Sequence, residues 1–163
     1  MVSALVAGPA VLPASAHDTS RPLTACVGSA GIHFSPGLSL WPRHSRIAGS
    51  AHYTCTGTDP GVKWAESVIK GRGETSCLSI ASTAVELVTW NTGEHSKVLY
   101  RQQPLVQAAG GQVVSLVDGT VIEGKYKGRS VSSPGLQITL DPLDCATKKG
   151  VELVDGPTTL VIV

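Results

Sequence analysis

The residues best suited to bind a ligand lie in and near the segment TWNTGEHSKVLY, which covers residues 89–100. Trp90, Glu94 and His95 belong to this segment, and Tyr126 belongs to a second segment, KYKGR, that mixes an aromatic ring with cations. Indole and phenol faces stack on sugar rings while nearby polar groups bind the hydroxyls. The sequence therefore predicts a carbohydrate-binding surface at these four residues. For Trp90 the favoured alternative is core packing, because the chain has a single Phe to fill its interior.

Catalysis by a nucleophile or by paired carboxylates receives little support from the sequence. A serine nucleophile needs an exposed turn, a His and an orienting carboxylate, and the chain contains no G-x-S-x-G motif. Glu66, Glu74 and Glu86 could cleave a glycoside if their strands brought two of them within about 5 to 9 Å. The favoured interpretation places all three on the solvent face of strands. We therefore predict no catalytic residue, and a secreted hydrolase stays the third hypothesis.

The four cysteines, Cys26, Cys55, Cys77 and Cys145, predict two disulfides. They are widely spaced, with no C-x-x-C pair and no clustered His, so no metal site is expected. Of the three possible connectivities we favour Cys55–Cys77, which would join neighbouring strands, and Cys26–Cys145, which would join the ends of the domain. No cofactor is expected either, because the segment AAGGQ precedes a strand and lacks the Lys of phosphate-binding loops.

Residues 1–16 are expected to form a secretory signal peptide. The run VSALVAGPAVLPASA is apolar and uncharged, and it ends in small residues that suit cleavage after Ala16. No Lys or Arg precedes this site, so the signal is expected to start upstream of Met1. Residues 17–25 are a polar leader. These features predict a secreted, extracellular protein, and the alternative is a disordered Ala/Pro leader on a cytosolic protein.

Residues 26–163 are expected to form one all-β domain. Short alternating runs end at Gly, Pro, Asp or Asn, with no sustained helical period. In one run Ala51, Tyr53 and Cys55 share a face, which indicates a half-buried strand, and the runs AVELVTW and SKVLY predict a hairpin. The pattern predicts an antiparallel β-sandwich or flattened barrel of about eight to ten strands.

Three finer expectations concern the second half of the domain. Gly119 lies inside the long β-run QVVSLVDGTVIEG and is expected to mark a bulge or bend. The terminal run TTLVIV is expected to be either a central strand or an exposed edge. A helical turn is expected only in CATKKGVEL.

A series of short motifs spans nearly all of the chain after the leader: FSPGL at 34–38, YTC at 53–55, TSC at 75–77, VTW at 88–90 and GTVIEGKYKGRSV at 119–131. In this order they resemble a group of small secreted β-rich proteins from actinobacteria. The resemblance implies the fold, export and the four-cysteine framework, and it carries over no catalytic residue. The charges in KYKGR and the His residues depart from the pattern of the group.

The formal net charge of +1 provides no field that would concentrate nucleic acid or anionic lipid at the surface. Neither partner is expected, and the apolar run in residues 1–16 is too short and too often interrupted by Pro to span a bilayer. The sequence predicts a secreted, non-catalytic binding protein whose ligand is an extracellular polysaccharide or, second, a secreted protein. The main alternative is a secreted protease inhibitor that presents Arg43 in the turn PRHSR or Lys127 in the turn KYKGR.

Overall fold

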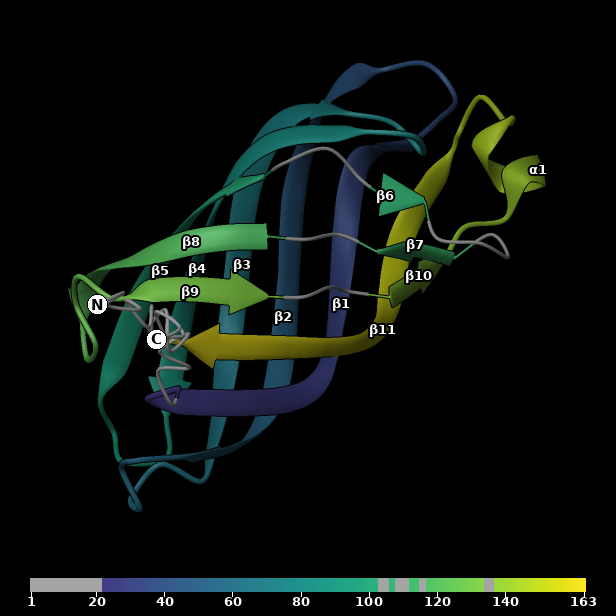
Figure 1. Ribbon diagram of the computed structural model, residues 1–163. Helices are drawn as coiled ribbons and strands as arrows, with labels where there is room; N and C mark the ends of the chain where they lie inside the picture. Colours follow the sequence, from purple (N-terminus) through teal and green to yellow (C-terminus); the bar gives the residue numbers. More distant parts are fainter. Residues whose placement is uncertain (1–21, 103–105, 108–111, 115–116, 134–136) are drawn as a thin grey trace, which may run out of the picture.

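The computed structural model describes residues 22–102, 106–107, 112–114, 117–133 and 137–163, and these residues are mostly β-structure (Figure 1). The elements are β1 (Thr24–Leu38), β2 (Arg43–Gly57), β3 (Trp64–Thr75), β4 (Ile80–Trp90), β5 (His95–Gln102), β6 (Val106–Gln107), β7 (Gln112–Val114), β8 (Val117–Gly124), β9 (Ser130–Ser133), β10 (Gln137–Thr139), α1 (Pro142–Cys145) and β11 (Val151–Ile162). The expected signal peptide and most of the leader lie outside the described residues. The first strand begins at Thr24, slightly before the expected start of the domain at Cys26.

Eight of these strands close into a barrel in the order β1-β11-β9-β8-β5-β4-β3-β2. Neighbouring strands are antiparallel, and except at the closing pair they follow one another along the chain. This is the topology of an up-and-down barrel. The strands β6, β7 and β10 form a separate small sheet, in which β7 and β10 continue the lines of β8 and β9 (Figure 1). The all-β prediction is confirmed, and of its two alternatives the chain forms the barrel.

The barrel closes where the first strand meets the last. β11 pairs with β1 from Thr24 opposite Ile162 onward, and with β9 through Val161 opposite Ser132. The run TTLVIV is therefore a central strand with partners on both sides. Because β11 is hydrogen-bonded on both sides and has no free edge, its apolar sequence does not invite pairing with other chains.

The inward side chains differ in size between the two ends of the barrel. The loops β2–β3, β4–β5 and β8–β9 lie at one end, which we call the Trp90 end, and the loops β1–β2 and β3–β4 lie with α1 at the other, the α1 end (Figure 1). At the Trp90 end, Trp90, Val98, Leu160 and Ile162 are almost fully buried. Farther along, the inward positions include small residues such as Ala30, Ala51 and Ala84, which leave space inside the barrel.

The disulfides join Cys26 to Cys55 and Cys77 to Cys145, so the two disulfides are confirmed but the favoured pairing is wrong. β1 and β2 form one long hairpin, whose register places Cys26 directly opposite Cys55. Cys77 lies in the β3–β4 loop at the α1 end, where it meets Cys145 in α1. One disulfide therefore links adjacent strands, and the other links a loop to the helix.

Gly119 does not mark a bulge. The pairing of β5 with β8 is continuous there, with Tyr100 opposite Gly119, and its register shifts only between Lys97 and Val98. A Cβ at Gly119 would lie 2.7 Å from Cδ1 of Tyr100, so the glycine makes room for the phenol ring. The short helix also differs slightly from the expectation, since α1 ends at Cys145, where the expected helical segment begins.

Candidate ligand-binding site

The structure brings the four predicted site residues to the Trp90 end but buries the central one. Trp90 is 1% exposed, its Nε1 donates to Ser96 Oγ at 2.8 Å, and its ring meets the Tyr126 ring edge-on at 5.6 Å between centroids. A sugar cannot stack on an indole that is already packed on all sides. The prediction of Trp90 as a carbohydrate platform is therefore wrong, and the core-packing alternative is correct.

Glu94 and His95 lie on the surface beside the buried Trp90 and the half-buried Tyr126. The Lys125 ammonium contacts Glu94 Oε2 and Asp59 Oδ2, each at 2.8 Å, and thereby joins the β2–β3, β4–β5 and β8–β9 loops. Hydrogen bonds to these carboxylates raise the pKa of Lys125, and the same contacts lower the pKa values of Asp59 and Glu94. Through its ion pair with Lys125, Glu94 therefore helps to hold the loops of the Trp90 end together.

The two basic turns are not shaped like the loop of a substrate-like protease inhibitor. The Arg43 guanidinium donates to the backbone carbonyls of Gly37, Lys148 and Lys149, so it is held by the protein itself. Lys127 is exposed, but it lies in a tight turn in which Tyr126 has a φ of 65° and the amide of Gly128 donates to Val121. Residues 43–46 of the first segment belong to β2 and pair with β3, and the second segment is a tight turn, so neither is a free loop that a protease could bind.

A cavity of about 90 Å³ lies inside the barrel, between the packed Trp90 end and the α1 end. Most of its wall is apolar, and the side chains come from strands around the ring; they include Ile32, Phe34, Ile47, Ile69, Ile80 and Val117. The polar part of the wall is formed by Tyr53, Glu86, Tyr100, Ser133 and Thr158. An eight-stranded barrel has an interior just wide enough to be filled by side chains or to hold one small ligand.

Glu86 is the centre of a hydrogen-bonded cluster in this wall. It is 2% exposed, and four adjacent strands contribute to the cluster: Tyr53 from β2, Ser67 from β3, Glu86 from β4 and Tyr100 from β5. Tyr53 Oη and Ser67 Oγ donate to Glu86 Oε1 at 3.0 and 2.5 Å, and Tyr100 Oη donates to Oε2 at 2.6 Å. These hydroxyls fix the carboxylate in one orientation at the cavity.

Sequence reasoning missed Glu86 as a site residue and placed it on the solvent face. The structure separates it from Glu66, which lies on the outer face of β3 beside His52 with a 63% exposed side chain. The wall of the barrel thus separates Glu86 from Glu66, and Glu74 is exposed on the same strand as Glu66. A signal was present, because strand alternation puts Glu86 on the same face as Val88 and Trp90. A lone carboxylate among buried apolar residues indicates a polar site in a core.

Burial raises the pKa values of Tyr53 and Tyr100 above the usual value of 10.0, and the nearby charge of Glu86 raises them further. An ionised phenol would lose hydration and would face the carboxylate at hydrogen-bond distance. Both phenols therefore remain protonated and continue to donate to Glu86 far into the alkaline range.

The free energy of unfolding is expected to fall as the pH rises above about 10, by about 1.4 kcal/mol per pH unit for each of these tyrosines. In that range the unfolded chain releases the phenol protons while the folded chain keeps them. This contribution is complete below pH 10 and is lost as the pH approaches the folded-state pKa values. Tyrosinate absorbance and circular dichroism, followed together, should show Tyr53 and Tyr100 ionising only as the barrel unfolds. Normal titration of both phenols in the intact barrel would contradict the buried cluster.

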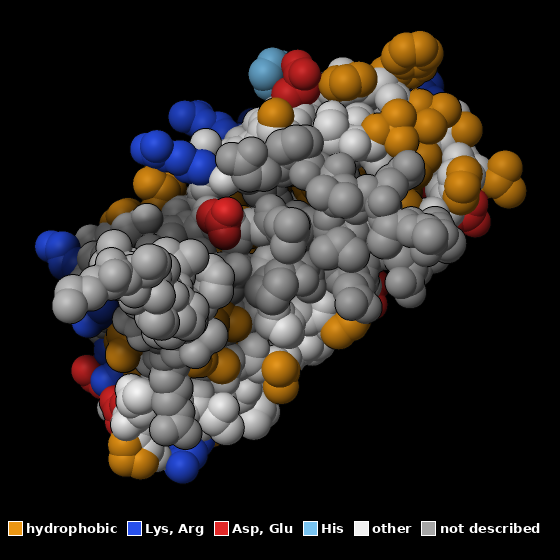
Figure 2. Space-filling view, in the orientation of Figure 1, with side chains coloured by type: hydrophobic (Ala, Val, Ile, Leu, Met, Phe, Trp, Pro, Cys, Tyr) orange, Lys and Arg blue, Asp and Glu red, His pale blue; other side chains and the backbone are white. Residues whose placement is uncertain are grey.

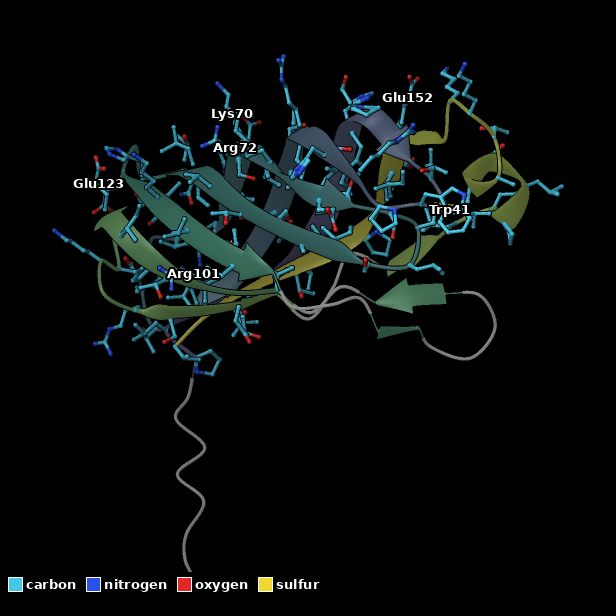
Figure 3. The ribbon with its side chains drawn as sticks, turned by 90° about the horizontal axis from the view of Figure 1, so that it is seen from above. Trp41, Lys70, Arg72, Arg101, Glu123 and Glu152 are labelled. Atoms are coloured by element: carbon cyan, nitrogen blue, oxygen red, sulfur yellow. A yellow bond between two sulfur atoms is a disulfide. The ribbon has the colours of Figure 1, made fainter. Side chains whose placement is uncertain are left out.

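Two exposed tryptophans lie outside the cavity wall, Trp64 at the Trp90 end and Trp41 at the α1 end. Trp41 is 81% exposed in the β1–β2 loop, and it lies beside α1 in Figure 3. With Leu40, Leu78 and Leu143, which are 43%, 57% and 77% exposed, it forms what we call the α1-end patch. Hydrophobic side chains gather at this end of the molecule in Figure 2. Beside the patch is an open hollow of about 410 Å³, lined in part by Trp41, Arg43 and Cys145.

Comparison with protein-family models, curated proteins and solved structures finds no match to the chain. In the part of the chain that the structure describes, no helix has the length and apolar character needed to cross a bilayer. Nor do His, Cys, Asp and Glu side chains gather, within those residues, into a group that could hold a metal ion. The functional interpretation therefore depends on the geometry of the barrel.

Proposed function

We propose that the protein is an extracellular, non-catalytic binding protein that encloses one small, largely apolar molecule inside its barrel. The observation that carries this proposal is the buried Glu86 carboxylate, held by three hydroxyls in the wall of a mostly apolar cavity. Small-molecule sites are usually built in this way, with apolar walls and a few convergent polar groups that fix the orientation of the ligand.

The size of the cavity limits the ligand to a compact molecule. A volume of about 90 Å³ leaves room for a compact molecule only. The apolar side chains of Ile69, Ile80 and Phe34 offer favourable contacts to a short hydrocarbon body. A single polar group on such a molecule would meet Glu86, Tyr53 or Tyr100.

A binding role is supported by the composition of the wall. Among the described residues that line the cavity, Glu86 is the one carboxylate, and no His accompanies it. Acid–base catalysis and nucleophilic catalysis ordinarily require a second group within hydrogen-bond reach. The hydroxyls around Glu86 instead suit it to orient a ligand.

An extracellular location is supported by the cysteines. All four are paired in disulfides, and disulfides persist mainly in oxidising compartments. The expected signal peptide at residues 1–16 and the resemblance to secreted actinobacterial proteins agree with this location.

The proposed function predicts that filling the cavity abolishes binding of a small neutral probe. Butan-1-ol at ten times its dissociation constant should stabilise the wild-type protein by about 1.4 kcal/mol, and it should shift the NMR signals of Ile69, Ile80 and Ala84. In the Ala84→Phe variant the phenyl ring should occupy the cavity, because Ala84 lies in its wall. We expect this variant to remain folded and to lose both effects.

The matched control is Val85→Phe, which places the same ring one residue along β4. Val85 lies opposite Lys70 and Leu99 on the outer face of the sheet, and Lys70 points away from the barrel in Figure 3. Binding should survive in this variant. The proposal fails if neutral and charged small probes alike leave the cavity signals unshifted, or if Ala84→Phe binds butan-1-ol as the wild type does.

A second candidate function is docking of a secreted protein at the α1-end patch. An exposed Trp among exposed Leu side chains is typical of protein-binding surfaces, and the neighbouring hollow offers a concave surface. This observation favours a protein over a polysaccharide as the surface ligand. The variant Trp41→Asp separates the two functions, because Trp41 lies outside the cavity wall and its replacement should leave butan-1-ol binding unchanged.

A further inference from the structure

The Glu86 carboxylate is buried without a cationic partner. It is 2% exposed, and none of the ion pairs within the described ranges involves it. Its neighbours Tyr53, Ser67 and Tyr100 are neutral hydroxyls. A buried carboxylate is ordinarily paired with a cation, because hydrogen bonds from neutral groups replace only part of its lost hydration.

The carboxylate also has an unused acceptor position. Two carboxylate oxygens offer about four acceptor sites. Oε1 accepts from Tyr53 and from Ser67, whereas among the described residues Oε2 accepts only from Tyr100. Glu86 thus lines the cavity with a carboxylate that can accept one more hydrogen bond, at Oε2. A ligand that both donates a hydrogen bond and carries positive charge would satisfy both needs.

We infer that the ligand is a small primary amine, bound as its cation, with the ammonium group on Glu86 Oε2 and a short alkyl body against the apolar wall. This inference rests on the proposed function, since it names the chemical class of the molecule that the barrel encloses. The ammonium gains a charge-assisted hydrogen bond in a site shielded from water. The alkyl body contacts Ile32, Ile69 and Ile80, which lie in the same cavity wall.

The charge of Glu86 should make the site selective among molecules of equal size. n-Butylamine, butan-1-ol and butyrate have similar bulk and differ in charge at neutral pH. The alcohol can donate one hydrogen bond to Oε2 but cannot neutralise the carboxylate. Butyrate brings a second negative charge beside Glu86, which a buried site disfavours strongly. The expected order of affinity is therefore amine, then alcohol, with no binding of the acid.

The test is an NMR titration of the full chain at neutral pH with each of the three probes. We expect n-butylamine to bind at least tenfold more tightly than butan-1-ol, and butyrate to leave the cavity signals unshifted. The variant Glu86→Gln keeps the side-chain volume and removes the charge, and it should reduce amine affinity at least tenfold while alcohol affinity changes less than threefold. The matched control Glu66→Gln removes an exposed carboxylate from the outer face and should bind all three probes as the wild type does.

The outcomes separate this inference from the proposed function. If butan-1-ol binds as tightly as n-butylamine, the amine inference is overturned while the interior binding site stands. If no probe shifts the cavity signals, both proposals fail together. If Glu86→Gln does not fold, the comparison of the three probes on the wild-type protein still tests the amine inference. Amine signals that shift equally in wild type and in folded Glu86→Gln would also overturn the inference, because binding would then not depend on the carboxylate.

Discussion

Replacing Trp90 by Ala is expected to lower the free energy of unfolding by about 4 kcal/mol. Trp90 is the largest of the almost fully buried side chains, and its removal leaves a cavity at the centre of the Trp90 end. The change also removes the hydrogen bond to Ser96 and the edge-on contact with Tyr126. A loss of this size is a large fraction of the stability of a typical domain.

The other two tryptophans provide matched controls for this prediction. Trp41 and Trp64 are 81% and 51% exposed, so replacing either by Ala should change the free energy of unfolding by about 0.5 kcal/mol or less. Urea unfolding followed by circular dichroism measures all three variants without relying on the fluorescence that the substitutions remove. Equal effects at the three positions would be inconsistent with an indole buried at the Trp90 end.

Removing the Cys77–Cys145 disulfide by replacing both residues with Ala is expected to cost about 4.4 kcal/mol of stability by the chain-entropy relation, for a sequence separation of 68. The same relation gives about 3.6 kcal/mol for removal of Cys26–Cys55, whose separation is 29. The reason is that the longer loop restricts the unfolded chain more. Cys26 and Cys55 are also held opposite each other by the β1–β2 pairing, which persists without the bond.

Urea unfolding of the two double variants, in the absence of reductant, tests the order of these effects. Peptide mapping of the unreduced wild-type protein checks the pairing itself, and it should yield Cys26 linked to Cys55 and Cys77 linked to Cys145. A map that contained Cys55 linked to Cys77 would contradict the hairpin register. Unchanged stability in both variants would show that the barrel does not depend on its crosslinks.

Local patterns in the sequence predicted the strands correctly, but they did not predict which side chains the strands enclose. Alternation correctly placed Ala51, Tyr53 and Cys55 on one buried face, and it identified the hairpin formed by β4 and β5. The same alternation put Glu86 with Val88 and Trp90, yet it could not say which face was inside. That choice depends on how a distant strand covers the face, and no local window contains this information.

Contacts between distant segments explain the remaining errors. The disulfide pairing depends on the register of β1 with β2 and on the position of α1 near the β3–β4 loop, which spacing along the chain does not fix. Gly119 was expected to mark a bulge or bend, because glycine within a strand commonly does so. Its actual role depends on Tyr100 in the facing strand. In each of these cases the deciding partner lies on another strand or loop.

Closure of the ring through β1 and β11 sets the order in which the protein can fold. The first strand cannot acquire its second neighbour until the last strand is available, and contacts this distant in sequence form slowly. Until then β1 and β9 each present an unpaired edge that other chains could join. The Cys26–Cys55 bond can form within the first hairpin, whereas Cys77–Cys145 must wait for α1. We therefore expect the Cys26–Cys55 disulfide to form before the Cys77–Cys145 disulfide during oxidative folding.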